Sequence, residues 1–278
     1  MPGVLFEGGT FRSVFSCGVM DALLDEKIEF PYCIGVSAGS AYGVSYVSRQ
    51  RGRNWRIIEH YRNDPRYVGK RNLLTDHSLF GVDFVFRTIP QELEPFDRRT
   101  FQDGHCKFVA VTTDAQTGKA CYFTNEDVDD TYEVLLASCA MPLLLPPGKI
   151  GGREYFDGGL SNPIPIDKLL HDGQKKALVV LTQPEGFEKT CQGSHKLGAL
   201  ALRYRYPKVA HRILTRYHKY NESVKLCERL EQMGRVVIIR PQYPLASLEG
   251  DIKVLEASYR MGYRLAMEKM DEIRELFR

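Results

Sequence analysis

The feature that most constrains the fold is a strand–turn–helix unit that occurs twice within the first 47 residues. In the first unit, the apolar run Val4–Phe6 passes through paired glycines into the helical pattern of Arg12–Leu24. In the second unit, Tyr32–Val36 passes through a sharp turn into the small-residue segment Ala38–Val47. Strands that alternate with helices pair in parallel, so this order predicts an α/β fold with a mostly parallel central sheet.

Elements farther along the chain extend the same pattern. Phe108–Thr113 and Ala120–Phe123 are predicted to form a hairpin, and Ala177–Thr182 and Arg235–Arg240 to form further buried strands. Apolar residues recur at helical spacing through Ile252–Leu276, which predicts a helix packed against the core. The expected architecture is a three-layer α/β/α fold with additional C-terminal helices.

The chain is long enough for one large domain or two small ones. It has 278 residues, of which 43% are hydrophobic. We expect residues 1–182 to form the core of the protein. Residues 183–278 are expected to form a helical region with one further strand, packed on that core.

Composition excludes several classes of protein. The seven cysteines are scattered and form no C-x-x-C pair, which argues against a zinc site or a disulfide framework and favours the reduced thiols of a cytoplasmic protein. The net charge of +3 is too small to indicate nucleic-acid binding. No signal sequence precedes Val4, and no run reaches the ~18 apolar residues of a membrane span. We expect a cytoplasmic protein that requires no metal or cofactor. Any contact with a membrane would be peripheral, at the inner face. The sequence does not determine the oligomeric state.

A candidate nucleophile lies at the second turn. Gly35-Val-Ser-Ala-Gly39 is a G-x-S-x-G sequence, in which Ser37 would occupy a strained turn between a strand and a helix. The flanking glycines keep side chains out of such a turn, and the N-terminus of the following helix places a positive dipole end beside the serine. The apolar residues before Ser37 and the small residues after it agree with this interpretation, although a simple structural turn is the alternative.

Two other glycine-rich turns are candidates for the same site. The paired glycines Gly8 and Gly9 follow the first strand, where backbone N–H groups could point at an anion such as a tetrahedral oxyanion or a phosphate. Asp157 ends a short apolar run and is followed by Gly158 and Gly159. Each turn taken alone is also consistent with an ordinary tight turn.

Histidine is the usual base for a catalytic serine, and none of the histidines has a recognisable catalytic context. A serine–histidine–aspartate esterase would require a histidine such as His171, His195 or His211 after the acid in the chain. The full set is His60, His77, His105, His171, His195, His211 and His218.

The order of the three motifs resembles the patatin-like phospholipase family, over at least Val4 to about Leu170. The C-terminal helices resemble those of bacterial members. The resemblance implies a lipid acyl-ester hydrolase of the phospholipase or lysophospholipase type, with residues 1–182 as the catalytic core. Ser37 would be the nucleophile and Asp157 the general base of a dyad without histidine. The amides of Gly8 and Gly9, helped by that of Ala38, would stabilise the oxyanion.

The glycine loop also departs from the family pattern. Arg12 matches the family's arginine, which the resemblance implies orders this loop. Thr10 and Ser13 stand where the family has glycine. These departures motivate one further alternative, a non-catalytic lipid-binding protein; an acyltransferase would use the same serine chemistry.

Two stretches of the chain are rich in basic residues, Arg49–Arg71 and Lys196–Lys219. The second contains no acidic residue and interleaves its basic residues with apolar ones. Such a segment is typical of a helix that lies on an anionic membrane surface, or of the solvated face of a cap helix.

Overall fold

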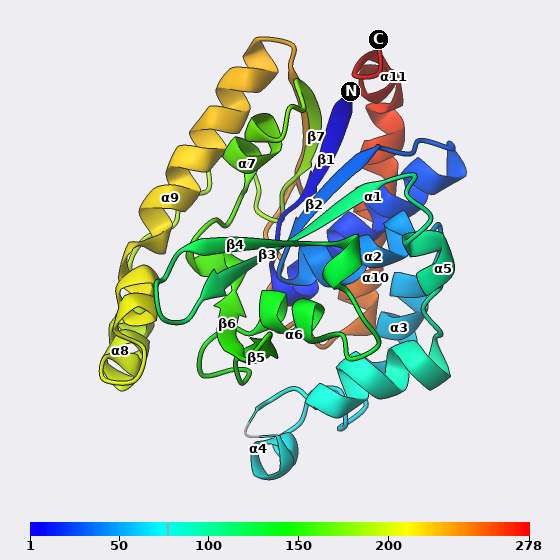
Figure 1. Ribbon diagram of the computed structural model, residues 1–278. Coiled ribbons are helices and arrows are strands. Elements are labelled where there is room, and N and C mark those ends of the chain that lie inside the picture. The colour runs from blue at the N-terminus through cyan, green and yellow to red at the C-terminus, as the bar shows by residue number, and fades with distance from the viewer. Residues whose placement is uncertain (77) are drawn as a thin grey trace.

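An eight-stranded sheet lies at the centre of the computed structural model, which describes residues 1–76 and 78–278 (Figure 1). His77 is outside the described residues. The strand order is β5-β6-β3-β2-β1-β7-β8, and β4 pairs with β3 outside that path. The strands are β1 (Pro2–Phe6), β2 (Tyr32–Val36), β3 (Lys107–Asp114), β4 (Ala120–Thr124), β5 (Gly148–Ile150), β6 (Arg153–Asp157), β7 (Lys176–Val180) and β8 (Val236–Ile239).

The middle of the sheet is parallel, as the alternation of strands and helices predicts. β1 pairs in parallel with β2 and β7, β2 with β3, and β7 with β8. The antiparallel pairings join β3 to β4 and β6, and β5 to β6. The predicted hairpin is therefore the β3–β4 pair, and the strand predicted near the C-terminus is β8, which lies in the same sheet as the core strands.

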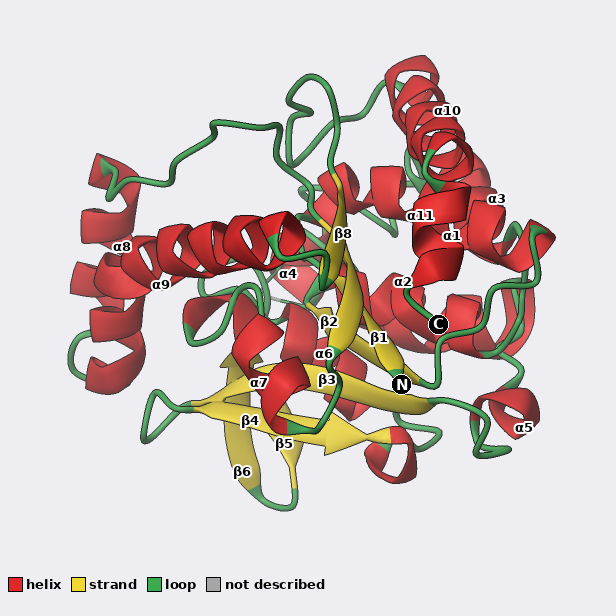
Figure 2. Cartoon of the chain, turned by 90° about the horizontal axis from the view of Figure 1, so that it is seen from above, coloured by secondary structure: helices red, strands yellow, loops and turns green. Residues whose placement is uncertain are grey.

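Helices cover both faces of the sheet, and Figures 1 and 2 show the three layers from two directions. α7 and α9 lie on one face, and α1, α2, α3 and α10 lie on the other. The α-helices are α1 (Val14–Asp25), α2 (Ala38–Val47), α3 (Arg53–Tyr61), α4 (Asn72–Thr75), α5 (Arg98–Phe101), α6 (Glu133–Cys139), α7 (Ile166–His171), α8 (Gly193–Leu202), α9 (Pro207–Gln232), α10 (Ile252–Glu268) and α11 (Met270–Glu275). The other helical segments are η1 (Thr10–Ser13), η2 (Phe84–Leu93), η3 (Asn125–Asp127) and η4 (Gly158–Leu160).

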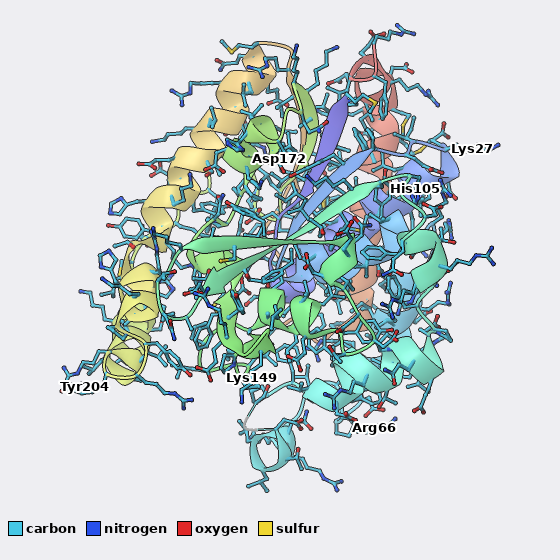
Figure 3. All side chains as sticks on the ribbon, viewed as in Figure 1. Lys27, Arg66, His105, Lys149, Asp172 and Tyr204 are labelled. Atoms are coloured by element: carbon cyan, nitrogen blue, oxygen red, sulfur yellow. The ribbon has the colours of Figure 1, made fainter. Side chains whose placement is uncertain are left out.

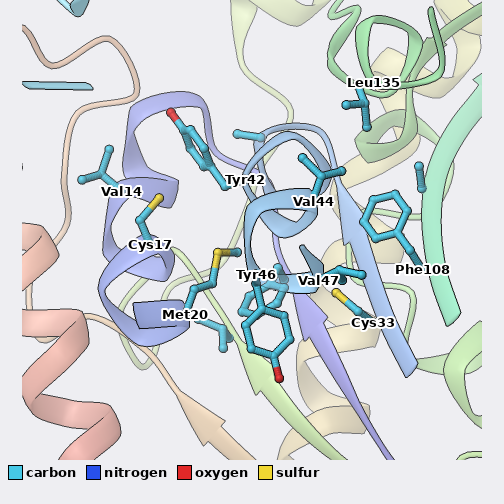
Figure 4. Packing of buried hydrophobic residues seen from close by; sticks show 14 of the residues in the cluster. Val14, Cys17, Met20, Cys33, Tyr42, Val44, Tyr46, Val47, Phe108 and Leu135 are labelled. Carbon is cyan, nitrogen blue, oxygen red and sulfur yellow. The ribbon is translucent and has the colours of Figure 1, made fainter. Parts of the chain in front are cut away.

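Each face of the sheet has its own hydrophobic core, because successive side chains of a strand point to opposite faces. On β1, Val4 and Phe6 pack with α1 and α2, whereas Leu5 packs with α7 and α9. Figure 4 shows part of the first core, where Met20 of α1 and Tyr46 of α2 are buried and the Tyr46 ring packs edge-on against Phe6 of β1. These two cores fix the positions of β1 and β2, and therefore the positions of the turns that follow these strands.

The ends of two predicted helices differ from expectation. The segment Arg12–Leu24 begins as the 3-10 turn η1 before α1 starts at Val14. The segment Ile252–Leu276 is interrupted at Lys269, where α10 ends and α11 begins. The second break keeps the apolar side of its segment toward the core, since Leu255 in α10 and Ile273 in α11 are fully buried.

Candidate active site

Ser37 occupies the turn between β2 and α2, and its backbone is strained. Its φ is 55° and its ψ is −129°, in a region that residues other than glycine rarely adopt. Such a conformation costs about 1–3 kcal/mol and persists only where the surrounding structure holds it. Strain of this kind at the start of a helix is the geometry that the G-x-S-x-G sequence predicts.

Two glycines allow the close packing around this turn. A Cβ on Gly39 would lie 2.2 Å from the carbonyl oxygen of Phe6, so α2 could not approach β1 with any side chain there. A Cβ on Gly8 would lie 2.6 Å from the carbonyl oxygen of Val36 and 2.7 Å from the Cβ of Ser37. The first glycine turn is therefore pressed directly against the candidate nucleophile. Gly35 and Gly158 also meet backbone atoms at short distance.

Asp157 reaches the same place along the edge of β3 that also pairs with β2, because β4 occupies the opposite edge. In the sheet register, Val36 pairs with Val111 of β3, and the next residue of β3, Thr112, pairs with Asp157 of β6. Because Ser37 directly follows Val36, the register brings the serine and the aspartate to adjacent points along one strand. The structure thus brings together two residues that are 120 positions apart in the numbering of the chain.

The Asp157 carboxylate is buried and held by a short hydrogen bond. Its Oδ1 accepts from the N–H of Gly159 at 2.7 Å. Burial raises the pKa of Asp157 above its ordinary value of 3.8. The nearby Ser37 hydroxyl and the hydrogen bond from the Gly159 N–H oppose that rise in pKa. A carboxylate whose pKa is raised by burial is a better proton acceptor than a solvated one.

The C-terminal end of α6 connects the serine to the aspartate. The Ser138 hydroxyl accepts a hydrogen bond from the Ser37 N–H at 3.0 Å and donates to the Val111 carbonyl at 2.8 Å. Two residues later, the Ala140 carbonyl accepts from the Asp157 N–H at 3.0 Å. One turn of chain therefore fixes both backbones, and Ser138 is a positioning residue that none of the sequence motifs contains.

Cys139, between these two anchors, lies next to the Ser37 hydroxyl. Burial raises the pKa of the Cys139 thiol far above its ordinary value, and the charge of Asp157 raises it further. The sulfur therefore stays protonated and is not a competing nucleophile.

The loop after β1 supplies candidate oxyanion donors. Within the described chain, no backbone acceptor is recorded for the N–H groups of Gly8 and Gly9. Ala38 is the first residue of α2, where helical N–H groups lack an intrahelical partner. These three amides and Ser37 line one cavity. Such an arrangement can stabilise negative charge that develops on an oxygen bound to Ser37.

The two departures in this loop have different structural consequences. Thr10 has a φ of 55°, so a β-branched residue occupies the left-handed conformation that glycine adopts at little cost. Ser13 is buried, and its hydroxyl donates to the Glu7 carbonyl at 3.3 Å, which ties η1 to the end of β1. Arg12 folds over Gly9, where a Cβ would lie 3.2 Å from the guanidinium Nε.

The cavity that contains these residues has a volume of about 630 Å³. One part of its lining is apolar and comes from α3 and from the segment that includes η2, with Ile57, Phe86 and Ile89 among its residues. Leu143 and Leu145, which follow α6, line it as well. A cavity of this size and polarity suits a ligand with a hydrocarbon chain.

Two basic side chains from the C-terminal part of the chain also line the cavity. Lys189 precedes α8 and Arg216 lies on α9. Burial lowers the pKa of both groups, that of Lys189 to about 7. No local sequence signal distinguishes these residues from the other basic residues around them.

The histidines proposed as alternatives are placed differently. His195 lines the cavity, whereas His171 and His211 are exposed and do not. The Nδ1 of His195 accepts a hydrogen bond from the Gln192 N–H at 3.1 Å, so the proton of the neutral ring lies on Nε2. This tautomer presents a donor to its other neighbours, whereas a general base needs a free acceptor nitrogen.

The basic stretches make different contacts. In Arg49–Arg71, four arginines form salt bridges with acidic residues: Arg49, Arg51, Arg56 and Arg66. Arg53 and Arg62 donate to partly buried backbone carbonyls. This stretch therefore provides little free positive charge. In Lys196–Lys219, Arg216 faces the cavity, and Leu197, Leu200 and Tyr204 are exposed on and beside α8.

In residues 1–76 and 78–278, no group of three histidine, cysteine or acidic side chains is placed to hold a metal ion. No helix in that part of the chain combines the length and the apolar composition that crossing a membrane requires.

Comparisons with known proteins agree with the motifs. The patatin-like phospholipase family matches residues 4–170, and a domain family of unknown function (DUF6363) matches residues 206–278. The chain is 24% identical over 270 residues to the uncharacterized protein YjjU of Escherichia coli, which covers 92% of this chain and 73% of that protein.

Other relatives share a smaller region. The mouse 1-acylglycerol-3-phosphate O-acyltransferase Pnpla3 is 30% identical over 138 residues, 48% of this chain and 32% of that protein. The lysophospholipase nte1 of Aspergillus niger is 24% identical over 176 residues, 60% of this chain and 11% of that protein. The crystal structure of VipD from Legionella pneumophila has the same fold, with a TM-score of 0.50 and 12% identity over 97% of this chain and 66% of that one.

Proposed function

This chain belongs to the patatin-like phospholipase family, and from that membership we propose that it hydrolyses lipid acyl esters through a dyad of Ser37 and Asp157. The observation that carries the proposal is the sheet register, which sets the end of β2 and the end of β6 beside adjacent residues of β3. The contact between the Ser37 hydroxyl and the buried Asp157 carboxylate supports it further.

In the proposed first step, the Ser37 oxygen attacks the carbonyl carbon of the ester while its proton passes to the Asp157 carboxylate. The carbonyl oxygen becomes an oxyanion, which accepts hydrogen bonds from the amides of Gly8, Gly9 and Ala38. The intermediate then collapses and breaks the bond to the alcohol. The departing alkoxide takes the proton back from Asp157, which leaves an acyl group on Ser37.

In the second step, Asp157 takes a proton from a water molecule as that water attacks the acyl-enzyme. Collapse of the second intermediate returns the proton to the Ser37 oxygen and releases the fatty acid. Asp157 serves as the base in both steps, so the reaction requires no histidine. The apolar wall of the cavity would hold the acyl chain, which fits a phospholipid or lysophospholipid substrate.

The test is covalent labelling with a fluorophosphonate, which traps an activated serine, followed by mass spectrometry of the labelled peptide. We expect labelling at Ser37 in the wild-type protein and none in Ser37→Ala. Ser13 and Ser138, which are buried near the site, serve as internal controls and should stay unlabelled. A folded wild-type protein that does not react would favour the non-catalytic, lipid-binding alternative.

A second candidate function is acyl transfer, which similarity to mouse Pnpla3, a protein named as an acyltransferase, favours. Transfer differs from hydrolysis only in the acceptor of the acyl group, because an alcohol replaces water in the second step. A lysophospholipid added as acceptor with a labelled acyl donor distinguishes the two: free fatty acid indicates hydrolysis, and a diacyl product indicates transfer.

We further propose that the cavity meets a lipid surface on the side of α8. Leu143, which lines the cavity, is exposed, and its side chain packs beside Gly198 of α8. Leu197 and Leu200 of α8 are also exposed. Figure 3 shows Tyr204 and Lys149 on this side of the molecule, below the sheet in that view. Apolar side chains among basic ones are the composition of a peripheral membrane contact.

Co-sedimentation with anionic lipid vesicles tests this contact. The double variant Leu197→Asp and Leu200→Asp should bind vesicles at least about tenfold more weakly, because each change places a charge where an apolar group would enter the interface. Met267→Asp, which changes an exposed apolar residue of α10, is the matched control and should bind as the wild type does. Equal binding by all three proteins would exclude α8 as the contact.

A further inference from the structure

Three basic side chains converge on the cavity close to Ser37. Arg12 comes from η1, Lys189 from the segment before α8, and Arg216 from α9. Lys189 and Arg216 lie outside the region that matches the patatin-like family, which ends at residue 170. These two residues are therefore a feature of this chain's C-terminal part and not of the motifs that define the candidate dyad.

Lys189 is held in place from two directions. Its backbone N–H donates to the Oδ1 of Asn221 at 2.9 Å, and its carbonyl accepts from the Nδ2 of Asn221 at 3.0 Å. Its Nζ lies 3.5 Å from the centre of the Tyr220 ring and 3.8 Å from the Oε1 of Glu7. Two neighbouring residues of α9 thus hold a partly buried ammonium group at the edge of the cavity.

Arg216 and Arg12 have unused hydrogen-bonding capacity. Within the described residues, the one recorded contact of the Arg216 guanidinium is from Nη1 to the Met141 sulfur, at 3.5 Å. The Nε of Arg12 is buried and has no partner in that part of the chain. A guanidinium carries five donors, and leaving buried donors unpaired is costly. Both groups therefore lack the partners that a ligand could supply.

The local charge favours an anion. Below the Lys189 pKa of about 7, Arg12, Lys189 and Arg216 supply three positive charges, and the ionised carboxylates of Glu7 and Asp157 supply two negative ones. Glu7 Oε2 is already occupied by the Thr182 N–H at 2.7 Å. The balance is one positive charge in a partly buried space, where an anion interacts more strongly than it would in water.

We propose that Arg12, Lys189 and Arg216 form a subsite for the phosphate oxygens of the substrate's headgroup. This proposal rests on the proposed function, since it takes the acyl ester to be bound at Ser37. The proposed subsite sets the orientation of the bound substrate. Its acyl chain lies along the apolar wall formed by α3 and η2, and its phosphate lies toward α9. Figure 1 shows α9 and α3 on opposite sides of the sheet.

The pH dependence of hydrolysis gives the subsite a specific signature. Burial lowers the pKa of Lys189 to about 7, so this ammonium loses its proton within an accessible range. Hydrolysis of a phosphate-bearing ester should therefore decline as pH rises through this value, whereas hydrolysis of a neutral ester should not. The charged and titratable groups around Lys189 are Glu7, Arg12, Asp157, His195, Arg216 and Tyr220. Of these, only Asp157 is the proposed base.

The experiment compares two substrates with the same acyl chain, lysophosphatidylglycerol and the neutral monoacylglycerol. Values of kcat/KM are taken from full pH profiles, so that a change in the ionisation of Asp157 is separated from a change in binding. Arg216→Met and Lys189→Met should lower kcat/KM for lysophosphatidylglycerol by about tenfold to hundredfold, the range for a lost charged hydrogen bond. The value for monoacylglycerol should change less than about threefold.

Arg229→Met and Lys225→Met are the matched controls, because both residues are exposed on α9 away from the cavity. They should leave both substrates unchanged. An equal loss on the two substrates in the Arg216 and Lys189 variants would overturn the proposal, because the cations would then act through the dyad. In Lys189→Met, kcat/KM for lysophosphatidylglycerol should no longer decline as pH rises through about 7, and the pH profile for monoacylglycerol should not change.

A binding measurement separates failure of the subsite from failure of the proposed function. Non-hydrolysable ether analogues of the two lipids are titrated into Ser37→Ala by calorimetry. The phosphate-bearing ether should bind at least about tenfold more tightly than the neutral one, and Arg216→Met should remove that difference. Equal affinity would refute the subsite whether or not the enzyme hydrolyses esters. Inorganic phosphate that displaces the anionic ether would support the same chemistry, with the free ion as a second occupant.

Discussion

Replacing Ser138 by alanine removes three hydrogen bonds at the point where the backbones of β3, α2 and α6 meet. The Ser37 N–H loses its acceptor at 3.0 Å, the Val111 carbonyl loses a donor at 2.8 Å, and the Ser40 hydroxyl loses a partner at 2.9 Å. All three groups are buried or partly buried, and the alanine methyl cannot replace the lost hydroxyl. The change adds no bulk, so its effects come from these bonds.

The expected destabilisation follows from the partners left behind. A buried donor or acceptor without a partner costs about 1–3 kcal/mol, and the Ser40 hydroxyl can rotate to a new partner. We therefore expect Ser138→Ala to lower the free energy of unfolding by about 2–4 kcal/mol. The strained Ser37 turn would also lose one restraint, and a displacement of ~1 Å at a reacting group can reduce the rate by ~10²-fold. We expect kcat to fall by about tenfold to hundredfold.

Urea unfolding followed by the fluorescence of the single tryptophan, Trp55, measures the stability term. Hydrolysis of a short-chain p-nitrophenyl ester measures the rate. Ser40→Ala is the control, because it removes one of the three bonds and leaves the Ser37 N–H paired; it should cost about 1 kcal/mol and little activity. A folded Ser138→Ala protein with wild-type stability and wild-type kcat would refute the positioning role.

Three further predictions concern the dyad and its loop. Burial raises the pKa of Asp157 above 3.8, and Asp157 must be ionised to act as a base. In a stopped-time ester assay, kcat/KM should therefore fall as pH decreases through a value above the pKa of an ordinary aspartate. Arg216→Met removes a charge that lowers this pKa, so it should move the fall to higher pH. The pKa of Asp157 is higher in the folded protein than in the unfolded chain, so its contribution to stability is complete at low pH, where the group is protonated in both states. That contribution is lost as pH rises through the pKa of the folded state. Ionised Asp157 therefore destabilises the fold at neutral pH. Asp157→Asn should therefore abolish hydrolysis while keeping or raising the melting temperature at neutral pH, and a lower melting temperature would contradict this. Thr10→Gly should relieve about 1–2 kcal/mol of strain in the left-handed backbone, and the greater entropy of glycine in the unfolded chain should cost about 0.5–1 kcal/mol. The melting temperature should therefore equal that of the wild type or lie slightly above it. A marked loss of stability would show that the threonine side chain holds the loop.

Much of the fold follows from local sequence signals. The apolar runs of β1, β2, β7 and β8 are short and continuous, as buried parallel strands are, and the structure has all four in the parallel part of the sheet. The small-residue segment after Ser37 predicts α2 because only small groups fit where that helix crosses β1. Gly39 shows the reason, since any side chain there would collide with the Phe6 carbonyl.

The helix ends were less predictable, because tertiary contacts determine them. Periodicity continues through Lys269, yet α10 ends there and α11 turns so that Ile273 still reaches the core. The hydrophobic pattern records which residues are buried but not the bend between them. The same limit applies to Thr10, whose left-handed backbone has no local signal in a residue that normally avoids it.

The sequence motifs locate the ends of β2 and β6 but not what connects them. Ser138 is a lone hydroxyl in the apolar run of α6, and a polar residue in such a run is the one signal that could have indicated it. Lys189 and Arg216 had no such signal, because many basic residues surround them in sequence. Only the packing of α9 against the sheet brings these two residues to the cavity.

The most direct test of the Ser37–Asp157 dyad is hydrolysis of p-nitrophenyl butyrate by the wild type, Ser37→Ala, Asp157→Asn and His195→Ala, each checked for folding by circular dichroism. His195 is included because, of the histidines weighed as bases, it is the one that lines the cavity. We predict that the serine and aspartate variants lose at least about a thousandfold in kcat and that His195→Ala stays within about threefold of the wild type. Activity that survives in folded Asp157→Asn but disappears in His195→Ala would contradict the dyad and assign the base to histidine.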